Sequence, residues 1–225
     1  MSSDLRKLHN EAKRQLIVDW VKPNSYVLDC GCGRGGDWWK WKAVKARVAA
    51  IDPDEESLKE AESRAIENQI GVWFLGVGDI RDAVSSGPYD VVCYNFSIHY
   101  IFESKLLFDQ SIKAIVQALK PGGILIGITP TKSRAEAIVN SESKFIDDLG
   151  NEIHIKGDRL MVKLSDGPFY ANAFKEEPLL DESIFIQKLE EAGMEPIAFG
   201  PMLSKPSGRI SDLYSKFVFR KSSKG

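Results

Sequence analysis

The sequence predicts an α/β fold of the Rossmann-like kind, in which helices flank a mostly parallel sheet. Two features predict it. Apolar runs of strand length alternate with amphipathic segments of helical length along the first half of the chain. The first of these runs, at 26–30, leads into a loop with four glycines within six residues, and this loop opens a helix. Strands that alternate with helices form parallel sheets, with ligand sites at the carboxyl ends of the strands.

The elements follow in a regular order. A helix is expected at about 5–21, and strands are expected at 26–30, 47–51, 72–77, 89–94 and 124–128. Helical patterns lie between them, at about 37–45, 55–68 and 104–119. The last of these ends at Lys120-Pro121-Gly122-Gly123, which is a strong stop signal.

After Pro130 the pattern is less regular. A helix is expected at about 133–149, short strands at 152–155 and 160–164, and a loop at 167–170. A helix at 181–192 and two late strands, 196–199 and 213–219, then complete a seven-stranded sheet. We therefore expect a single domain, residues 1–225, in which segment 131–180 is an insertion.

The composition restricts the possible functions. No apolar stretch reaches the roughly 18 residues that span a bilayer, and the charged N-terminus lacks a signal-peptide core, so an intracellular protein with no membrane partner is expected. A net charge of -2 argues against a protein that coats nucleic acid by bulk charge, so any nucleic acid must be gripped locally. No metal is expected, because Cys30-Gly31-Cys32 lacks the second ligand pair of a zinc site.

The glycine loop predicts a site for a nucleotide-like ligand, since backbone amides and a helix N-terminus can approach phosphate or carboxylate groups there. Gly31, Gly33 and Gly36 also fit the dinucleotide fingerprint, so a nicotinamide or flavin enzyme is one alternative. Asp52 ends the next strand, where an acid can accept hydrogen bonds from ribose hydroxyls. The structural alternatives are tight turns at the glycines and the start of a helix at Asp52.

Two stretches resemble a known protein family. Residues 27–41 read VLDCGCGRGGDWWKW, and residues 89–104 read YDVVCYNFSIHYIFES. Together they resemble the mRNA cap guanine-N7 methyltransferases, and the second stretch is the more specific one. Segments 8–17, 120–130, 177–180 and 213–221 resemble further parts of that family in the same order, so the likeness covers essentially the whole chain.

The resemblance implies a class I methyltransferase fold with a cap-binding insertion after the fifth strand and an N-terminal helix, residues 1–22, over the cofactor site. It implies S-adenosylmethionine (AdoMet) as methyl donor and the capped 5′ end of RNA (GpppN) as acceptor. The implied cofactor-binding residues are Lys13, Asp29, Gly31, Gly33, Asp52, Pro53, Asp79, Ile80, Asn95, Phe96 and Tyr100. The implied substrate-binding residues are His9, Asn10, Arg34, Lys40, Arg64, His99, Tyr100, Phe102, Glu177 and Tyr214. His99 and Tyr100 would line the reactive centre.

The sequence departs from the family pattern in several places. His9 stands where the family usually has Asn, Asn95 where it often has Gln, and Asp166 near a common aromatic cap contact. The loop at 170–177 is shorter than usual, and this compact insertion resembles versions from large DNA viruses more than the longer cellular ones. The expected location is therefore the cytoplasm or virion for a viral protein, and the nucleus for a cellular one.

The chemistry expected of such a site needs no catalytic acid or base. Guanine N7 offers an unprotonated lone pair, so the rate would depend on positioning. Asp79 can accept from the adenine amino group, with Ile80 packing on the ring. Glu177 can accept two hydrogens from guanine in an arrangement that adenine cannot satisfy. Arg34, Lys40 and Arg64 would bind the triphosphate bridge.

Other functions stay open at this stage. One is a methyltransferase of the same fold with another acceptor, and another is a non-catalytic capping subunit, which the intact glycine loop disfavours. At single residues, His99 and Tyr214 could be packing side chains, Arg64 could pair with Glu60, and Glu177 could be a surface charge. Because no Lys-x-Asp-Gly motif occurs, guanylyltransferase and triphosphatase partners are expected on another chain or domain.

Overall fold

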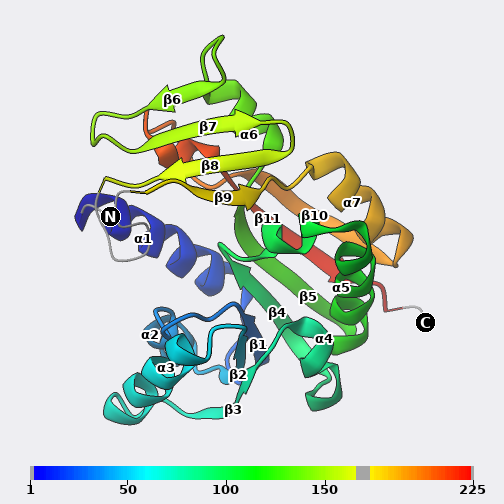
Figure 1. The fold of residues 1–225 in the computed structure, drawn as a ribbon. Helices are drawn as coiled ribbons and strands as arrows, with labels where there is room; N and C mark the ends of the chain where they lie inside the picture. Colours follow the sequence, from blue (N-terminus) through cyan, green and yellow to red (C-terminus); the bar gives the residue numbers. More distant parts are fainter. Residues whose placement is uncertain (1–2, 166–172, 224–225) are drawn as a thin grey trace.

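The computed structural model describes residues 3–165 and 173–223, and its centre is a seven-stranded sheet (Figure 1). The strand order is β10-β11-β5-β4-β1-β2-β3. The strands are β1 (Tyr26–Cys30), β2 (Arg47–Asp52), β3 (Val72–Val77), β4 (Tyr89–Asn95), β5 (Leu119–Pro130), β10 (Met194–Pro201) and β11 (Tyr214–Lys221). The first five pair in parallel, whereas β11 is antiparallel to both β5 and β10. The mostly parallel sheet predicted from the sequence is confirmed.

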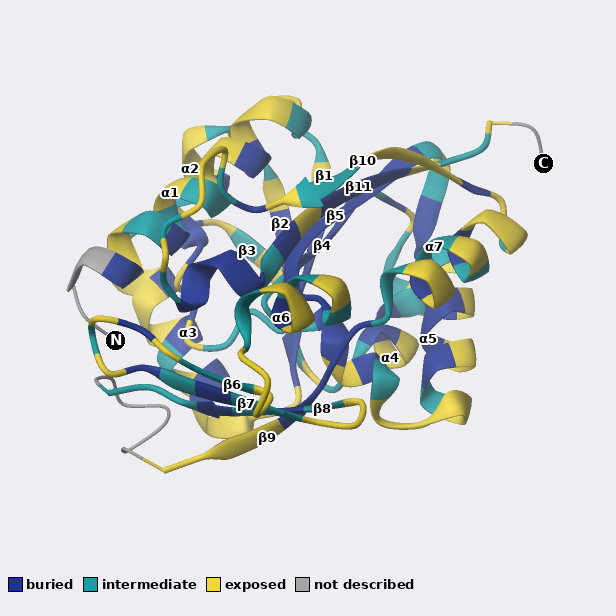
Figure 2. Cartoon of the chain, turned by 90° about the horizontal axis from the view of Figure 1, so that it is seen from above, coloured by how far each residue is buried: buried dark blue, intermediate teal, exposed yellow. Residues whose placement is uncertain are grey.

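Two groups of helices cover the two faces of this sheet. The helices α1 (Ser3–Trp20), α2 (Trp38–Ala43) and α3 (Glu55–Glu67) pack on one face, and α4 (Ile80–Ala83), α5 (Lys105–Ala118) and α7 (Glu182–Glu191) pack on the other. A short 3-10 turn, η1 (Val84–Ser86), follows α4. Adjacent strand residues point to opposite faces of the sheet. Val27 therefore packs in the core under α1, α2 and α3, which we call the main core, and Leu28 packs in the core under α4, α5 and α7. Figure 2 shows the central strands buried between these layers.

A second, antiparallel sheet is built from segment 131–180. Its strands are β6 (Lys144–Ile146), β7 (Glu152–Lys156), β8 (Arg159–Lys163) and β9 (Lys175–Pro178), in that order. Its apolar face packs on α6 (Lys132–Ile138), on the 3-10 turn η3 (Ile210–Leu213) and on Leu5 of α1. The N-terminal helix therefore contributes to both the main core and this smaller core.

The predicted helix at 133–149 is wrong beyond Ile138. Val139 has extended backbone, and the Asn140 side chain accepts hydrogen bonds from the amides of Glu142 (2.9 Å) and Lys144 (3.1 Å). An asparagine that binds its own downstream amides offers the backbone an alternative to the helix, so the chain turns here into β6.

Other differences are smaller. Leu119 starts β5 directly after α5, so the predicted stop at 120–123 forms an irregularity inside a strand, where Gly122 has φ +76°. Strand β9 has no sequence prediction. The predicted loop at 167–170 and Asp166 lie outside the described residues. Of the described helices, none combines the length and apolar character that a membrane crossing needs.

Candidate active site

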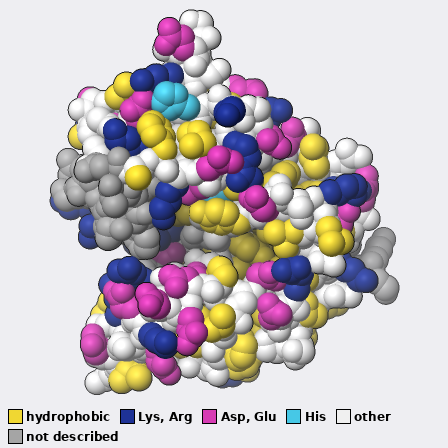
Figure 3. All heavy atoms as spheres, viewed as in Figure 1, with side chains coloured by type: hydrophobic (Ala, Val, Ile, Leu, Met, Phe, Trp, Pro, Cys, Tyr) yellow, Lys and Arg dark blue, Asp and Glu magenta, His cyan; other side chains and the backbone are white. Residues whose placement is uncertain are grey.

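The candidate site lies where β1 and β4 run side by side and end. Their carboxyl ends are followed by the glycine loop and by the 3-10 helix η2 (Ile98–Glu103). The chain order of the strands reverses between β1 and β4, which is where open parallel sheets bind ligands. Figure 3 shows a hollow at this level, between the second sheet above and the body of the main sheet below.

The glycine loop holds two distinct glycines. Gly31 has φ +73°, and an added Cβ would lie 2.5 Å from the Cβ of Ser97, so only glycine fits there. Gly33 has φ +51°, but an added Cβ would meet no atom within 4 Å. Its amide donates to Asp52 Oδ2 at 2.7 Å. The loop is thus tied to β2 while its backbone at Gly33 borders open space that a ligand can enter.

Asp52 and Asp79 end neighbouring strands but differ in their pairing. Asp52 is buried, and its other oxygen accepts from the amide of Asp54 at 2.9 Å, so each oxygen keeps acceptor capacity for a ribose hydroxyl. Pro53 beside it is exposed. Asp79 caps α4 and pairs with the guanidinium of Arg81 at 2.5 Å, a hydrogen bond that lowers the pKa of Asp79. An adenine amino group would share Asp79 with Arg81.

Asp37 is the functional candidate that sequence reasoning missed. Its buried carboxylate pairs with Lys13 of α1 at 2.6 Å and with Lys40 of α2 at 2.7 Å, and it accepts from Asn95 Nδ2 of β4 at 3.0 Å. Burial acts to raise the pKa of Asp37, but the two ammonium groups lower it to about 2. Asp37 therefore holds three predicted site residues together. In the sequence, only its position between the glycine loop and a helix indicated that it could belong to the site.

Two polar groups beside Asp37 are deeply buried. The Oδ1 atom of Asn95 is buried and accepts no hydrogen bond from the described residues. An unpaired buried acceptor costs about 1 to 3 kcal/mol, so a ligand that donates a hydrogen bond fits there. Asp29 accepts from the Trp41 indole at 2.8 Å, and burial followed by the charge of Asp37 raises the pKa of Asp29 to about 7. Asp29 lies beneath the site rather than on its wall, at 2% exposure.

A second group joins the two sheets. On η2, Tyr100 donates its hydroxyl to Glu177 Oε1 of β9 at 3.0 Å. His99 Nε2 lies 3.4 Å from Glu177 Oε2, without hydrogen-bond geometry. Glu177 is only 8% exposed. Burial first, then Glu177 and the charge of Asp52, raise the pKa of Tyr100. The alternative that Glu177 is a surface charge is wrong.

Aromatic rings form the wall between α1 and β11. His9 stacks on Phe96 at a centroid distance of 5.0 Å, and Tyr214 meets Phe96 edge-on at 4.9 Å. Phe96 has φ +64°, which turns its ring out of the strand direction. Burial, followed by Glu177 and Tyr100, raises the pKa of Tyr214. The ring contacts bring His9, Phe96 and Tyr214 together, and a hydrogen bond joins Tyr100 to Glu177.

Of the three basic residues expected at the triphosphate, Arg34 and Arg64 lie together beside Glu60, whereas Lys40 belongs to the cluster around Asp37. Lys40 is nearly buried and donates to Asn10 Oδ1 (2.9 Å) as well as to Asp37. Arg34 and Arg64 both pair with Glu60 on α3, so the alternative partner of Arg64 is the one observed. Ile80 is 1% exposed and lies in the core. Phe102 packs against Phe108 with ring centroids 4.6 Å apart.

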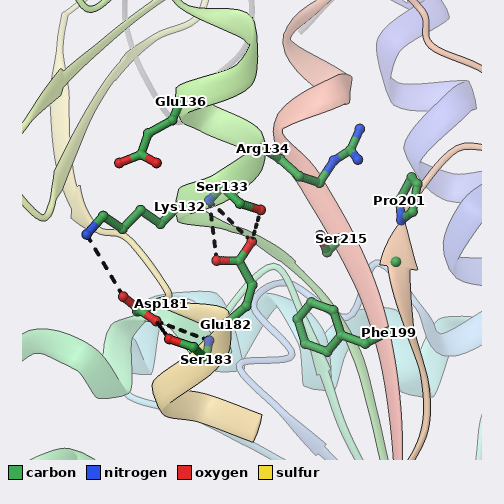
Figure 4. A pocket seen from close by; sticks show the side chains of 11 residues that line it. Lys132, Ser133, Arg134, Glu136, Asp181, Glu182, Ser183, Phe199, Pro201 and Ser215 are labelled. Carbon is green, nitrogen blue, oxygen red and sulfur yellow. Dashed lines mark hydrogen bonds and ion pairs between the residues drawn. The ribbon is translucent and has the colours of Figure 1, made fainter.

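A separate cavity of about 610 Å³ lies where α6, α7 and β10 meet (Figure 4). Its charged groups point toward one another: Lys132 faces Asp181 at 3.9 Å, and the Ser133 amide donates to Glu182 at 3.3 Å. These contacts join the start of α6 to the start of α7 beside the cavity.

Comparison with known proteins identifies the family. Residues 27–123 match the methyltransferase domain model, and residues 76–173 match the mRNA (guanine-N(7))-methyltransferase domain model. The chain is 31% identical over 165 residues to the mRNA cap guanine-N(7) methyltransferase of Eremothecium gossypii, covering 67% of this chain and 38% of that protein. Over 151 residues it is 32% identical to that of Caenorhabditis elegans, covering 58% of this chain and 40% of that protein. The chain thus spans about two fifths of the length of these relatives.

Solved structures show the same fold. An S-adenosylmethionine-dependent methyltransferase from Clostridium acetobutylicum matches with a TM-score of 0.70 at 18% identity, covering 96% of this chain and 92% of that chain. CalS10, an amino pentose methyltransferase from Micromonospora echinaspora, matches with a TM-score of 0.68 at 18% identity over 96% of this chain and 92% of that chain. The fold, the order of the site residues and the two family matches agree, and the chain belongs to the mRNA cap guanine-N7 methyltransferase family, with the class I methyltransferase fold.

Proposed function

We propose that this chain transfers a methyl group from AdoMet to N7 of the guanosine cap at the 5′ end of mRNA. The observation that carries the proposal is the position of Tyr100. It donates to the buried Glu177 of the second sheet, and its 3-10 helix η2 begins directly after Ser97, whose Oγ donates to the Cys30 carbonyl at the start of the glycine loop. The helix η2 therefore connects the carboxylate that we propose to recognise guanine with the loop that we propose to bind AdoMet.

The residues of the glycine loop and its surroundings fit AdoMet. The backbone at Gly33 borders open space, Asp52 keeps acceptor capacity, and Asn95 Oδ1 has no donor within the described part of the chain. When bound, AdoMet supplies an electrophilic methyl group on a sulfonium. The N7 lone pair forms the new bond to carbon, and the electrons of the carbon–sulfur bond return to sulfur. No proton moves, so none of these side chains has to act as an acid or a base.

Catalysis then depends on how the cap is held. A reactive pair held in line at about 3 to 3.5 Å gains about 7 to 11 kcal/mol from proximity and orientation. Glu177 accepts from N1–H and the 2-amino group of guanine, while Tyr100 and His99 fix its orientation. Positive charge moves onto the guanine during transfer, and a carboxylate with the nearby rings of Phe96 and Tyr214 stabilises it.

We also propose an acceptor, partner activities and a location in the cell for this chain. Capped RNA would be the acceptor, and the triphosphatase and guanylyltransferase steps would come from other domains or chains. Arg34 and Arg64 would reach the phosphates only by exchanging Glu60 for them. We propose an intracellular location, while a viral origin and a specific compartment stay predictions.

Two substitutions test the division of labour. In Glu177→Ala, we expect KM for GpppG to rise about tenfold to a hundredfold, because charge-assisted hydrogen bonds to guanine are lost, with unchanged AdoMet affinity. In Asp52→Ala, we expect weaker AdoMet binding with an unchanged KM for GpppG. Glu176→Ala is the control, because Glu176 is the exposed neighbour on β9. Calorimetry measures AdoMet binding, and labelled methyl transfer measures the cap. Equal loss of both properties in both variants would contradict the proposal.

A further inference from the structure

A basic groove lies at the end of the main sheet that is opposite the candidate active site. Its lining includes Tyr26 and Arg47, the first residues of β1 and β2, and Trp73 near the start of β3. Lys42 and Lys45 complete its polar side, and its volume is about 770 Å³. At a rise of about 3.3 Å per residue, β1 and β2 place the groove about 13 to 17 Å from their carboxyl ends, which border the active site.

No carboxylate of the described residues forms an ion pair with the cations of this basic groove. Three cationic side chains line it, and the described lining contains no carboxylate, although the chain as a whole carries a net charge of -2. Lys42 donates to the Asn68 carbonyl at 3.0 Å, and Arg47 donates to the Tyr26 hydroxyl at 2.6 Å. The side-chain ammonium of Lys45 has no partner among the described residues. An anionic ligand would therefore meet three cations without displacing an acid.

Aromatic side chains in the basic groove are unusually exposed. Trp73 is 49% exposed and Tyr26 is 37% exposed, although large aromatic rings are mostly buried in single domains. The guanidinium of Arg47 lies 5.2 Å from the centre of the Tyr26 ring. Cations that follow a backbone beside a ring that stacks on bases are the combination that binds single-stranded nucleic acid.

We propose that the basic groove binds single-stranded RNA, as a second site for the body of the RNA whose cap enters the active site. The choice of RNA rests on the proposed function. Lys42, Lys45 and Arg47 bind phosphates, and Trp73 stacks on a base. Because the groove lies at the opposite end of the strands, about 13 to 17 Å from the active site, a cap dinucleotide bound in the active site leaves the groove empty, whereas a longer RNA reaches both.

The test measures binding of an uncapped, 5′-hydroxyl RNA of about 15 nucleotides to the full chain by fluorescence anisotropy at several salt concentrations. We expect Trp73→Ala to weaken binding about tenfold or more. Lys45→Glu should weaken binding and reduce the salt slope by about 0.7 or more, the value for one lost phosphate contact. Lys113→Glu is the control, because it makes the same charge change at an exposed site on α5.

Methyl transfer to two acceptors completes the test. KM for a long capped RNA should rise in Lys45→Glu and Trp73→Ala, while transfer to GpppG stays at the wild-type rate in both. Two results would overturn the proposed RNA site. One is equal RNA affinity in wild type and both variants, and the other is an equal loss of RNA affinity in Lys45→Glu and Lys113→Glu. If neither wild type nor any variant methylates GpppG but RNA binding follows the expected pattern, the proposed function is wrong and the proposal that the groove binds RNA is supported.

Discussion

His9 makes the stability of the protein depend on pH. Its side chain is buried and contacts Ser211 Oγ at 2.9 Å. Burial, followed by the charge of Lys13, lowers the pKa of His9 from 6.5 to about 4. Between these values the unfolded chain binds a proton that the folded chain does not. The stability of the folded chain is therefore complete above pH 6.5 and falls as the pH drops toward 4.

Urea unfolding measures this effect. From the two pKa values, wild type should lose about 2 kcal/mol of unfolding free energy through His9 between pH 7 and pH 5. In His9→Asn this part of the loss should disappear, because an amide does not titrate. Parallel pH curves for wild type and the variant would show that the folded state does not suppress protonation of His9.

The second prediction at the residue scale concerns Asp37. Asp37→Asn leaves the ammonium groups of Lys13 and Lys40 close together without their shared carboxylate. Breaking a buried ion pair from one side costs about 3 to 5 kcal/mol, and we expect a loss of that size in urea unfolding. Glu60→Gln is the control, because its pairs with Arg34 and Arg64 are exposed and worth less than about 1 kcal/mol. An equally small loss of unfolding free energy in Asp37→Asn would show that the Asp37 carboxylate does not hold the two lysines in place.

At the scale of the element, α1 connects the two cores. Leu5 is 1% exposed and packs under the second sheet, whereas Ile17, near the other end of the helix, lies in the main core. Leu5→Ala should lower the unfolding free energy by about 2 to 4 kcal/mol. Hydrogen exchange should then accelerate in β7 and β8 more than in β1 and β4. Val18→Ala is the control on the same helix, because Val18 is 47% exposed. Uniform acceleration in both sheets would contradict the separate cores.

The elements also show how far the sequence predicts structure. Strands β1 to β5 were predictable because buried parallel strands are short apolar runs between turn signals. The helix after Ile138 was not, because Asn140 binds its own downstream amides, a contact that composition does not reveal. Strand β9 was missed because Lys175-Glu176-Glu177-Pro178 carries no apolar alternation. It is a strand because it pairs with β8, and that pairing places Glu177 beside Tyr100.

At the scale of the whole molecule, the site joins residues far apart in sequence. The glycine loop, Asp52 and Asn95 were predictable because each ends a strand at one edge of the sheet. Tyr100 and Glu177 lie 77 positions apart and were assigned to one site only through the family resemblance, which did not predict the hydrogen bond between them. The contacts of Asp37 were missed because a lone acid before a helix is usually an N-cap. Only the fold brings Lys13 and Asn95 to this carboxylate.

Ligand binding should stabilise the whole molecule. At about a hundredfold its Kd, AdoMet should add about 2.7 kcal/mol, which raises Tm by about 5 to 10 °C in a domain of this size. A nicotinamide dinucleotide at the same concentration should leave Tm unchanged, and differential scanning fluorimetry reads both. A rise with the nicotinamide dinucleotide and none with AdoMet would favour the dinucleotide alternative.

The central claim is that the guanine of an RNA cap is methylated at N7 by a site that positions it without acid or base. The most direct measurement is transfer of labelled methyl from AdoMet to GpppG-capped RNA, followed by nuclease digestion and identification of the labelled nucleoside. We predict that the label is found only in 7-methylguanosine derived from the cap. Label on a ribose, on an internal base or on no nucleoside at all would contradict the account.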